Sequence, residues 1–129
     1  MWLDRVATAL LLLVGVVNLL PGFVAFAPSR ITTAYGVTAT GPDFADLSVL
    51  LRHRAVLLGL IGLALIYAAF TPSFRVPGIT AGAISMGSFV LLTRSAPGLN
   101  HATMRVARID IAAIMLLAVA AVLLWRHNT

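Results

Sequence analysis

Long apolar runs, each ended by polar or turn-forming residues, dominate the pattern along the chain. The first run is Val6–Phe26, the second ends at Phe70, the third is Val76–Thr93, and the last extends from about Val106 to Trp125. Each run is close to the ~20 residues that an α-helix needs to cross the ~30 Å core of a bilayer. Because lipid offers no partners to backbone groups, such segments cross the membrane as helices. The pattern therefore predicts an all-α chain.

The connections between the runs predict how the helices are arranged. "TPSFR" (Thr71–Arg75) is so short that the second and third helices should be antiparallel neighbours. In the longest connection, Ser29 suits a helix N-cap and Gly36 the position after a helix, so we expect a short helix at the membrane interface. Together these features predict an integral membrane up-down four-helix bundle in a single domain. Its helices are expected at about 4–27, 45–70, 76–93 and 105–126.

Composition makes lipid the expected solvent for much of the surface. Of the 129 residues, 60% are hydrophobic, and the mean hydropathy is +1.02. A water-soluble domain of this size cannot bury so much apolar surface. The net charge of +5 favours anionic lipid headgroups, whereas arginines scattered at segment ends argue against nucleic acid as a partner. The chain has no cysteine, which excludes disulfides and a cysteine nucleophile.

Small and polar residues inside the helices indicate close packing. Small residues four positions apart let helix backbones approach one another in a membrane, so we interpret Gly78 and Gly82 as packing residues, with a homodimer face as the alternative. Asn18 should form a hydrogen bond to another helix, and Pro21 should kink the first helix. The predicted packing residues are Asn18, Gly59, Gly62, Gly78, Gly82 and Gly87.

Charged residues gather at one end of the predicted bundle, because the second and fourth helices start on the same side. At 1.5 Å per residue, Arg54 lies about 24 Å before Phe70, and Asp110 about 22 Å before Trp125. If these aromatic residues mark the far boundary, both charges lie several ångströms inside the hydrocarbon core. The predicted ligand or ion-pair cluster consists of Arg52, Arg54, Arg105, Arg108 and Asp110, with His53 nearby.

Two arginines compete for Asp110. Equal depth favours Arg54, whereas the helical period places Arg52 on the stripe of small residues that should face the bundle. His53 points elsewhere and is the weaker neighbour. The sequence leaves the choice between Arg52 and Arg54 open.

Three interpretations of the cluster follow from its chemistry. It is an ion pair that locks two helices together, a polar pocket for a carboxylate, phosphate or quinone-like oxygen, or an acid/base site. Asp110 and His53 are the candidate catalytic residues, although no second carboxylate is expected beside them. The histidines lack metal-ligand spacing, so neither a metal nor a cofactor is predicted.

Arginine counts bear on the orientation in the membrane. The loop side carries six and the terminal side three, and the positive-inside rule then places both termini outside the cytoplasm. If three of the six belong to a site, each side keeps three and the orientation stays undetermined. The loop-side arginines are Arg30, Arg52, Arg54, Arg94, Arg105 and Arg108; those on the terminal side are Arg5, Arg75 and Arg126.

Three segments resemble the DoxX-like group of small bacterial four-helix membrane proteins. They are "FAPSRITTAYG" after the first helix, "LLRHRAVLLGLIGLALIYAAF" in the second and "ARIDIAAIMLLAV" opening the fourth. The resemblance implies the four-helix fold, a multi-pass location in the bacterial inner membrane and a recurring arginine at the head of the second helix, here Arg52 or Arg54. Some members of that group accompany quinone-linked oxidoreductases.

Together these features favour a binding or accessory component of a membrane complex. Its expected partners are membrane lipids, further copies of the chain or a larger complex, and a quinone-like or anionic lipid ligand. One alternative is a small membrane enzyme that acts on a lipid-soluble (quinone-, lipid- or isoprenoid-like) substrate at the cluster. The other is a structural oligomer packed through the third helix.

Overall fold

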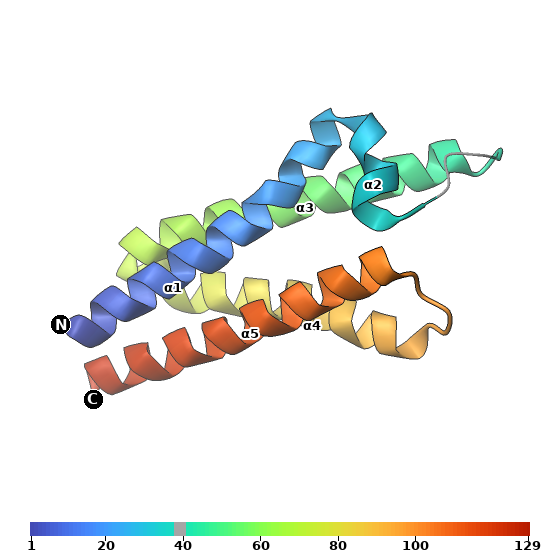
Figure 1. The fold of residues 1–129 in the computed structure, drawn as a ribbon. Helices are drawn as coiled ribbons and strands as arrows, with labels where there is room; N and C mark the ends of the chain where they lie inside the picture. The colour runs from blue at the N-terminus through green and yellow to red at the C-terminus, as the bar shows by residue number, and fades with distance from the viewer. Residues whose placement is uncertain (38–40) are drawn as a thin grey trace.

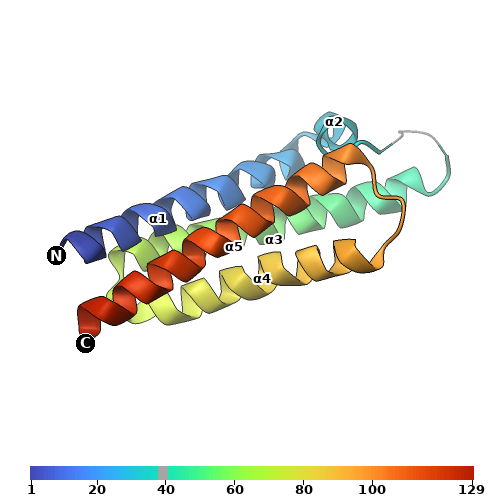
Figure 2. The ribbon, with the colours of Figure 1, turned by 60° about the horizontal axis from the view of Figure 1, so that its bottom comes forward.

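Four long helices make up most of the chain. The computed structural model describes residues 1–37 and 41–129, and all of its regular elements are helical. The long helices run side by side with both termini at one end (Figures 1 and 2). The prediction of an all-α chain is confirmed, and each of the four is long and apolar enough to cross a membrane. These helices are α1 (Trp2–Leu19), α3 (Phe44–Phe70), α4 (Arg75–Ser95) and α5 (His101–Asn128).

Short helical segments connect the long helices. Pro21 explains why α1 ends at Leu19 and not at about residue 27: proline lacks an N–H and its ring clashes with the preceding turn. The chain continues there as the 3₁₀ segment η1 (Leu20–Phe26). The segments that follow are η2 (Pro28–Arg30) and α2 (Ile31–Tyr35), with η3 (Pro72–Phe74) between α3 and α4.

The start of α5 corrects another expected boundary. The helix begins at His101, earlier than the expected residue 105, because Asn100 caps it. The side-chain oxygen of Asn100 accepts a hydrogen bond from the Thr103 backbone N–H at 2.8 Å. Asparagine is among the preferred residues at this position, since it satisfies a backbone donor that has no partner inside the helix.

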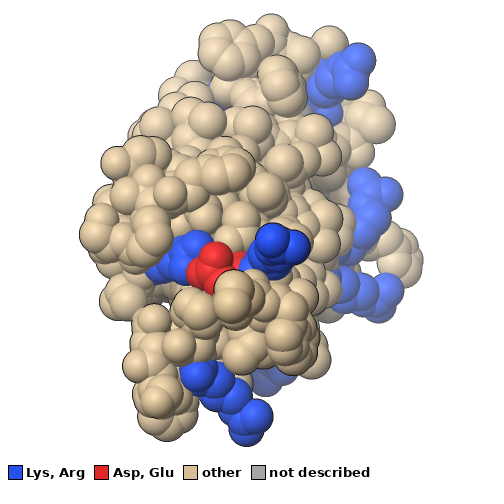
Figure 3. Space-filling model, turned by 90° about the vertical axis from the view of Figure 1, so that its left-hand side faces the viewer, with Lys and Arg blue, Asp and Glu red and all other residues tan. Residues whose placement is uncertain are grey.

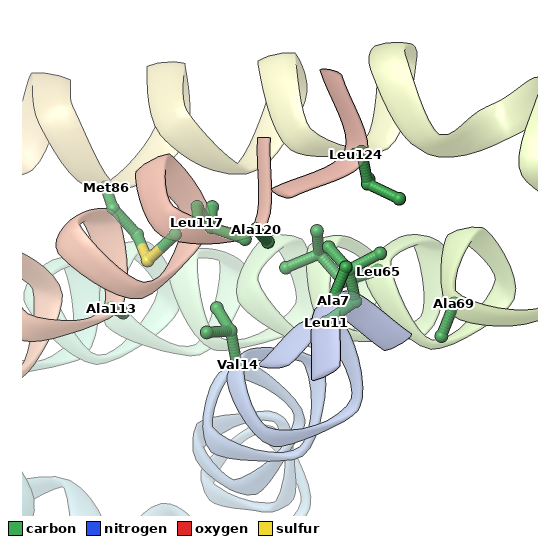
Figure 4. Close-up of a cluster of buried hydrophobic side chains, with 10 residues drawn as sticks. All are labelled: Ala7, Leu11, Val14, Leu65, Ala69, Met86, Ala113, Leu117, Ala120 and Leu124. Carbon is green, nitrogen blue, oxygen red and sulfur yellow. The ribbon is translucent and has the colours of Figure 1, made fainter. Parts of the chain in front are cut away.

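The buried core is narrow and draws on all four long helices (Figure 4). Many large apolar side chains lie on the outer surface instead; Phe23, Leu60 and Met115, for example, are 65%, 56% and 64% exposed. Water-soluble monomers rarely expose contiguous apolar surface on this scale. The core residues are Ala7, Leu11 and Val14 of α1, Leu65 and Ala69 of α3, Met86 of α4, and Ala113, Leu117, Ala120 and Leu124 of α5.

Glycines let α3 lie directly against the first helix. A Cβ atom added at Gly62 would lie 2.6 Å from the Gly15 carbonyl oxygen and 2.7 Å from the Leu19 nitrogen, so only glycine fits there. Gly59 faces Gly22 of η1 less tightly: a Cβ added at Gly59 would lie 3.6 Å from the Gly22 Cα, an ordinary van der Waals contact. The α1–α3 contact is therefore backbone against backbone.

The glycines of α4 divide into two kinds. A Cβ added at Gly78 would lie 2.9 Å from the Ala68 Cβ, and one added at Gly82 would lie 3.2 Å from a methyl group of Leu117. Both glycines thus pack within the chain. Gly87 was also expected to lie at a packed face, but it does not: a Cβ added there meets no described atom within 4 Å.

Replacement of a glycine by alanine should lower stability where the helices are closely packed and should not do so where the glycine lies at an open surface. We expect Gly62→Ala to lower the free energy of unfolding by about 1–3 kcal/mol, because the new methyl group meets only backbone atoms, which cannot move aside. Gly87→Ala is the matched control and should leave stability unchanged or slightly higher. Thermal unfolding in detergent measures both. Equal stability of the two variants would contradict the close approach of α1 and α3.

Candidate functional site

Arg54 of α3 lies at the centre of a polar cluster inside the loop-side end of the bundle. Its Nη1 donates a hydrogen bond of 2.8 Å to the Tyr35 hydroxyl of α2. Its Cζ lies 4.2 Å from the ring centroid of Phe89 in α4 and 5.6 Å from that of Tyr35. Aromatic faces attract a guanidinium, and more strongly where water is excluded. Arg54 is therefore held by two helices even before its acidic partner is considered.

Asp110 of α5 is the acidic partner of Arg54. The Arg54 Nη2 and the Asp110 Oδ2 are 4.0 Å apart, which makes an ion pair but is too long for a hydrogen bond. The Asp110 side chain is only 9% exposed, and its Oδ2 has no hydrogen-bond partner among the described residues. A buried polar atom normally has such a partner, so this oxygen is an exception that requires explanation.

The other arginines of the predicted cluster lie elsewhere. Arg52 is exposed, and its Nε donates a hydrogen bond of 2.8 Å to the Ala25 carbonyl in η1. Arg105 and Arg108 of α5 are exposed as well. The structure therefore brings Arg54, and not these three, to Asp110. The cluster expected from the sequence is reduced to one ion pair.

His53 does not share a site with Asp110. It is exposed and lines a hollow between η1 and α3 together with Arg52, Ala25 and Phe26. Asp110 lines a different cavity. Because the two candidate catalytic residues are not brought together, the geometry gives no acid/base pair.

An apolar cavity of about 240 Å³ adjoins Asp110. We call it the Asp110 cavity. Besides Asp110, its one polar lining side chain is Asn18, which is 4% exposed. Most of its walls come from α1, η1 and α5. The lining residues are Val17, Asn18, Leu20, Pro21, Leu58, Val106, Ile109 and Asp110.

Asn18 contributes an acceptor to this cavity. Its Nδ2 donates to the Val14 carbonyl at 2.9 Å and contacts the Met86 sulfur at 3.6 Å, the latter reaching across to α4. Both amide hydrogens thus have partners within the protein. What Asn18 can still offer a ligand is its amide oxygen, an acceptor like the carboxylate of Asp110.

Two residues of the cluster were missed in the sequence, Tyr35 and Phe89. Tyr35 lies in a segment recognised there only as a short helix, and Phe89 reads as an ordinary apolar residue of a membrane helix. Their alignment with Arg54 depends on how α2 and α4 pack against α3. The one signal available in the sequence was that Tyr35 is a polar aromatic residue just before Gly36. In the structure, Gly36 ends α2 with a φ of 64°.

A second ion pair, also missed, lies near the two termini. The Arg75 Nη1 donates to the Asp4 carboxylate at 2.5 Å, and its Nη2 donates to the Thr8 hydroxyl and the Ala69 carbonyl, both at 3.3 Å. Figure 3 shows acidic atoms between basic side chains on this end of the molecule. Arg75 also borders a cavity of about 400 Å³ between α4 and α5. Since Asp4 balances its charge, we interpret this pair as a structural link from α1 to the α3–α4 turn.

Comparisons of the chain with protein-family models, curated proteins and solved structures found no match. Its function is therefore inferred from the contacts described above.

Removing Arg54 should cost more stability than removing Arg52. We expect Arg54→Gln to lower the free energy of unfolding by on the order of 2 kcal/mol, because it leaves Asp110 buried without a countercharge. Adding Asp110→Asn to that variant should restore part of the loss. Arg52→Gln, the matched control, loses a single hydrogen bond worth about 1 kcal/mol.

Thermal unfolding in the same detergent provides the comparison. A larger loss for Arg52→Gln than for Arg54→Gln, or no recovery on adding Asp110→Asn, would show that Arg54 does not compensate Asp110.

Proposed function

We propose that this chain is a multi-pass membrane protein that binds a small lipid-soluble molecule bearing a hydrogen-bond donor. The ligand lies in the Asp110 cavity and donates to the Asp110 carboxylate. The observation that carries the proposal is the buried Oδ2 of Asp110, which lacks a hydrogen-bond partner among the described residues beside an apolar cavity of about 240 Å³. Ligand sites are typically apolar with a few placed polar groups, as this one is.

The polar groups of the cavity define the chemistry of the ligand. Asp110 is an acceptor when ionised, and the unused group of Asn18 is an acceptor as well. A quinone carbonyl would therefore find no donor in this cavity, whereas an alcohol or the hydroxyl of a quinol would find an acceptor. Among the ligands considered from the sequence, the lining favours the hydroxyl-bearing ones.

The walls of the cavity suggest how the ligand enters. Leu20 and Ile109 line it and are also 58% and 46% exposed on the outer surface of the bundle. In a membrane this surface faces lipid, so a lipid-soluble molecule can reach the cavity sideways between η1 and α5. A water-soluble ligand would have no comparable route along these apolar side chains.

The membrane arrangement is part of the same proposal. The four long helices cross the bilayer up and down, and α2 lies at the interface on the side of the loops. The exposed apolar side chains and the four apolar helices support it. The resemblance of three segments to DoxX-like proteins agrees with it and adds the bacterial inner membrane as the location. A role as a binding or accessory component of a membrane complex is the function that fits.

Geraniol, a short isoprenoid alcohol, and its methyl ether form a matched pair of probes for the ligand class. Wild-type protein in lipid nanodiscs should bind labelled geraniol about tenfold more tightly than the ether, because only the alcohol donates a hydrogen bond to a charged acceptor. Asp110→Asn should reduce this preference, because the amide oxygen still accepts a hydrogen bond but carries no charge. Equilibrium binding, corrected with protein-free nanodiscs, measures the four dissociation constants.

Filling the cavity gives the second arm of this test. Val106→Phe places a large ring where Val106 lines the cavity and should abolish geraniol binding. Val119→Phe is the control, since Val119 is 48% exposed on the outside of α5 and should leave binding unchanged. Equal affinity for alcohol and ether in wild-type protein, or unchanged binding to Val106→Phe, would refute the proposed site.

A further inference from the structure

A second hollow at the loop-side end of the bundle has the opposite chemistry to the Asp110 cavity. It has a volume of about 470 Å³ and lies between α2 and the first turns of α5. Its lining contains two guanidinium groups, a hydroxyl group and no acidic residue: Arg30, Thr33, Ala34 and Arg105. It shares no lining residue with the Asp110 cavity.

Hydrogen bonds hold the two walls of this hollow together. Asn100 donates from Nδ2 to the Tyr35 carbonyl at 2.8 Å and to the Gly36 carbonyl at 3.3 Å. Its Oδ1 at the same time caps α5 at Thr103. One side chain therefore fixes the end of α2 to the start of α5, and the hollow lies between two elements of defined separation.

The buried face of α2 determines which of its residues face the hollow. Ile31 is fully buried and Tyr35 is 8% exposed, and these residues, four positions apart, lie on one face of the helix. Thr33 and Ala34, on the other faces, line the hollow together with Arg30 just before the helix. Arg30 and Arg105, from two different elements, therefore line the same hollow.

The two arginines are available to a ligand. Both side chains are exposed, and no ion pair or hydrogen bond to either guanidinium is found within residues 1–37 and 41–129. Arg54 and Arg75, in contrast, are each paired with an aspartate. Two uncompensated charges on separate elements repel each other, and an anion placed between them would remove that repulsion.

We infer that this hollow is a phosphate site that binds the headgroup of an anionic membrane lipid between Arg30 and Arg105. Arginine offers paired N–H groups that match two phosphate oxygens, and the Thr33 hydroxyl can donate to a third. The lipid is the expected source of the phosphate because α2 is proposed to lie at the interface, at the level of the headgroups. The site does not depend on which molecule, if any, occupies the Asp110 cavity.

The test is binding of short-chain phosphatidylglycerol to the full-length protein in neutral detergent. Arg30→Gln and Arg105→Gln should each weaken binding about tenfold, since each removes charge-assisted hydrogen bonds to the phosphate. Both side chains are exposed, so the lipid-free variants should keep the melting temperature of the wild type. The double variant Arg30→Gln/Arg105→Gln should weaken binding further. Its matched control is Arg94→Gln/Arg108→Gln, which removes the same charge from two exposed arginines outside the hollow and should weaken binding less than about twofold.

Two further observations decide the outcome. If the control variant loses as much affinity as Arg30→Gln/Arg105→Gln, attraction is by net charge alone and the site is refuted. Inorganic phosphate in the same titration distinguishes the sources of the phosphate group. Displacement of the lipid only by other anionic lipids supports a headgroup site, whereas displacement by equal concentrations of inorganic phosphate overturns the lipid as its occupant.

Discussion

A buried carboxylate on an apolar helix requires a compensating positive charge close by. At the loop-side end of the helices, the contacts between four elements centre on the ion pair that meets this requirement. Arg54 meets Asp110 from α3, and the same guanidinium contacts Tyr35 of α2 and Phe89 of α4. Desolvating charges costs several kcal/mol for each ion, so such a pair persists only where other contacts support it. These contacts connect α2, α3, α4 and α5 at one position. Among the described residues, the buried Oδ2 of Asp110 has no hydrogen-bond partner, and the proposed ligand would supply one.

The four long helices were predictable because each is a run of apolar residues of membrane-spanning length. The residues at which these helices begin and end were less predictable. α1 changes to 3₁₀ geometry near Pro21, where the sequence suggested only a kink, and α5 begins early because Asn100 caps it. Both differences are caused by single residues, and the length of an apolar run does not reveal such effects. The packing glycines were recognised on α3 and α4, but their counterparts Gly15 and Gly22 were not.

The question of which arginine meets Asp110 shows why the site was harder to predict than the fold. The small-residue stripe of α3 does face into the bundle, but it packs against α1 and η1, as the contact of Gly62 with Gly15 shows. Arg52 follows that stripe and bonds to Ala25 of η1. Asp110 lies on α5, on another side of α3, where Arg54 points. The helical period showed which face of α3 is packed, but not which helix packs against it. The position along the helix, in contrast, correctly placed Arg54 level with Asp110.

Infrared difference spectroscopy of the protein in lipid, with and without geraniol, reports on the Asp110 carboxyl group itself. If the ligand donates a hydrogen bond to Asp110, a carboxyl band should shift on binding in the wild-type protein and in the control Val119→Phe. The same band should be absent from the difference spectrum of Asp110→Asn. Geraniol that binds the wild type without moving any band that Asp110→Asn removes would contradict a ligand held by this carboxylate.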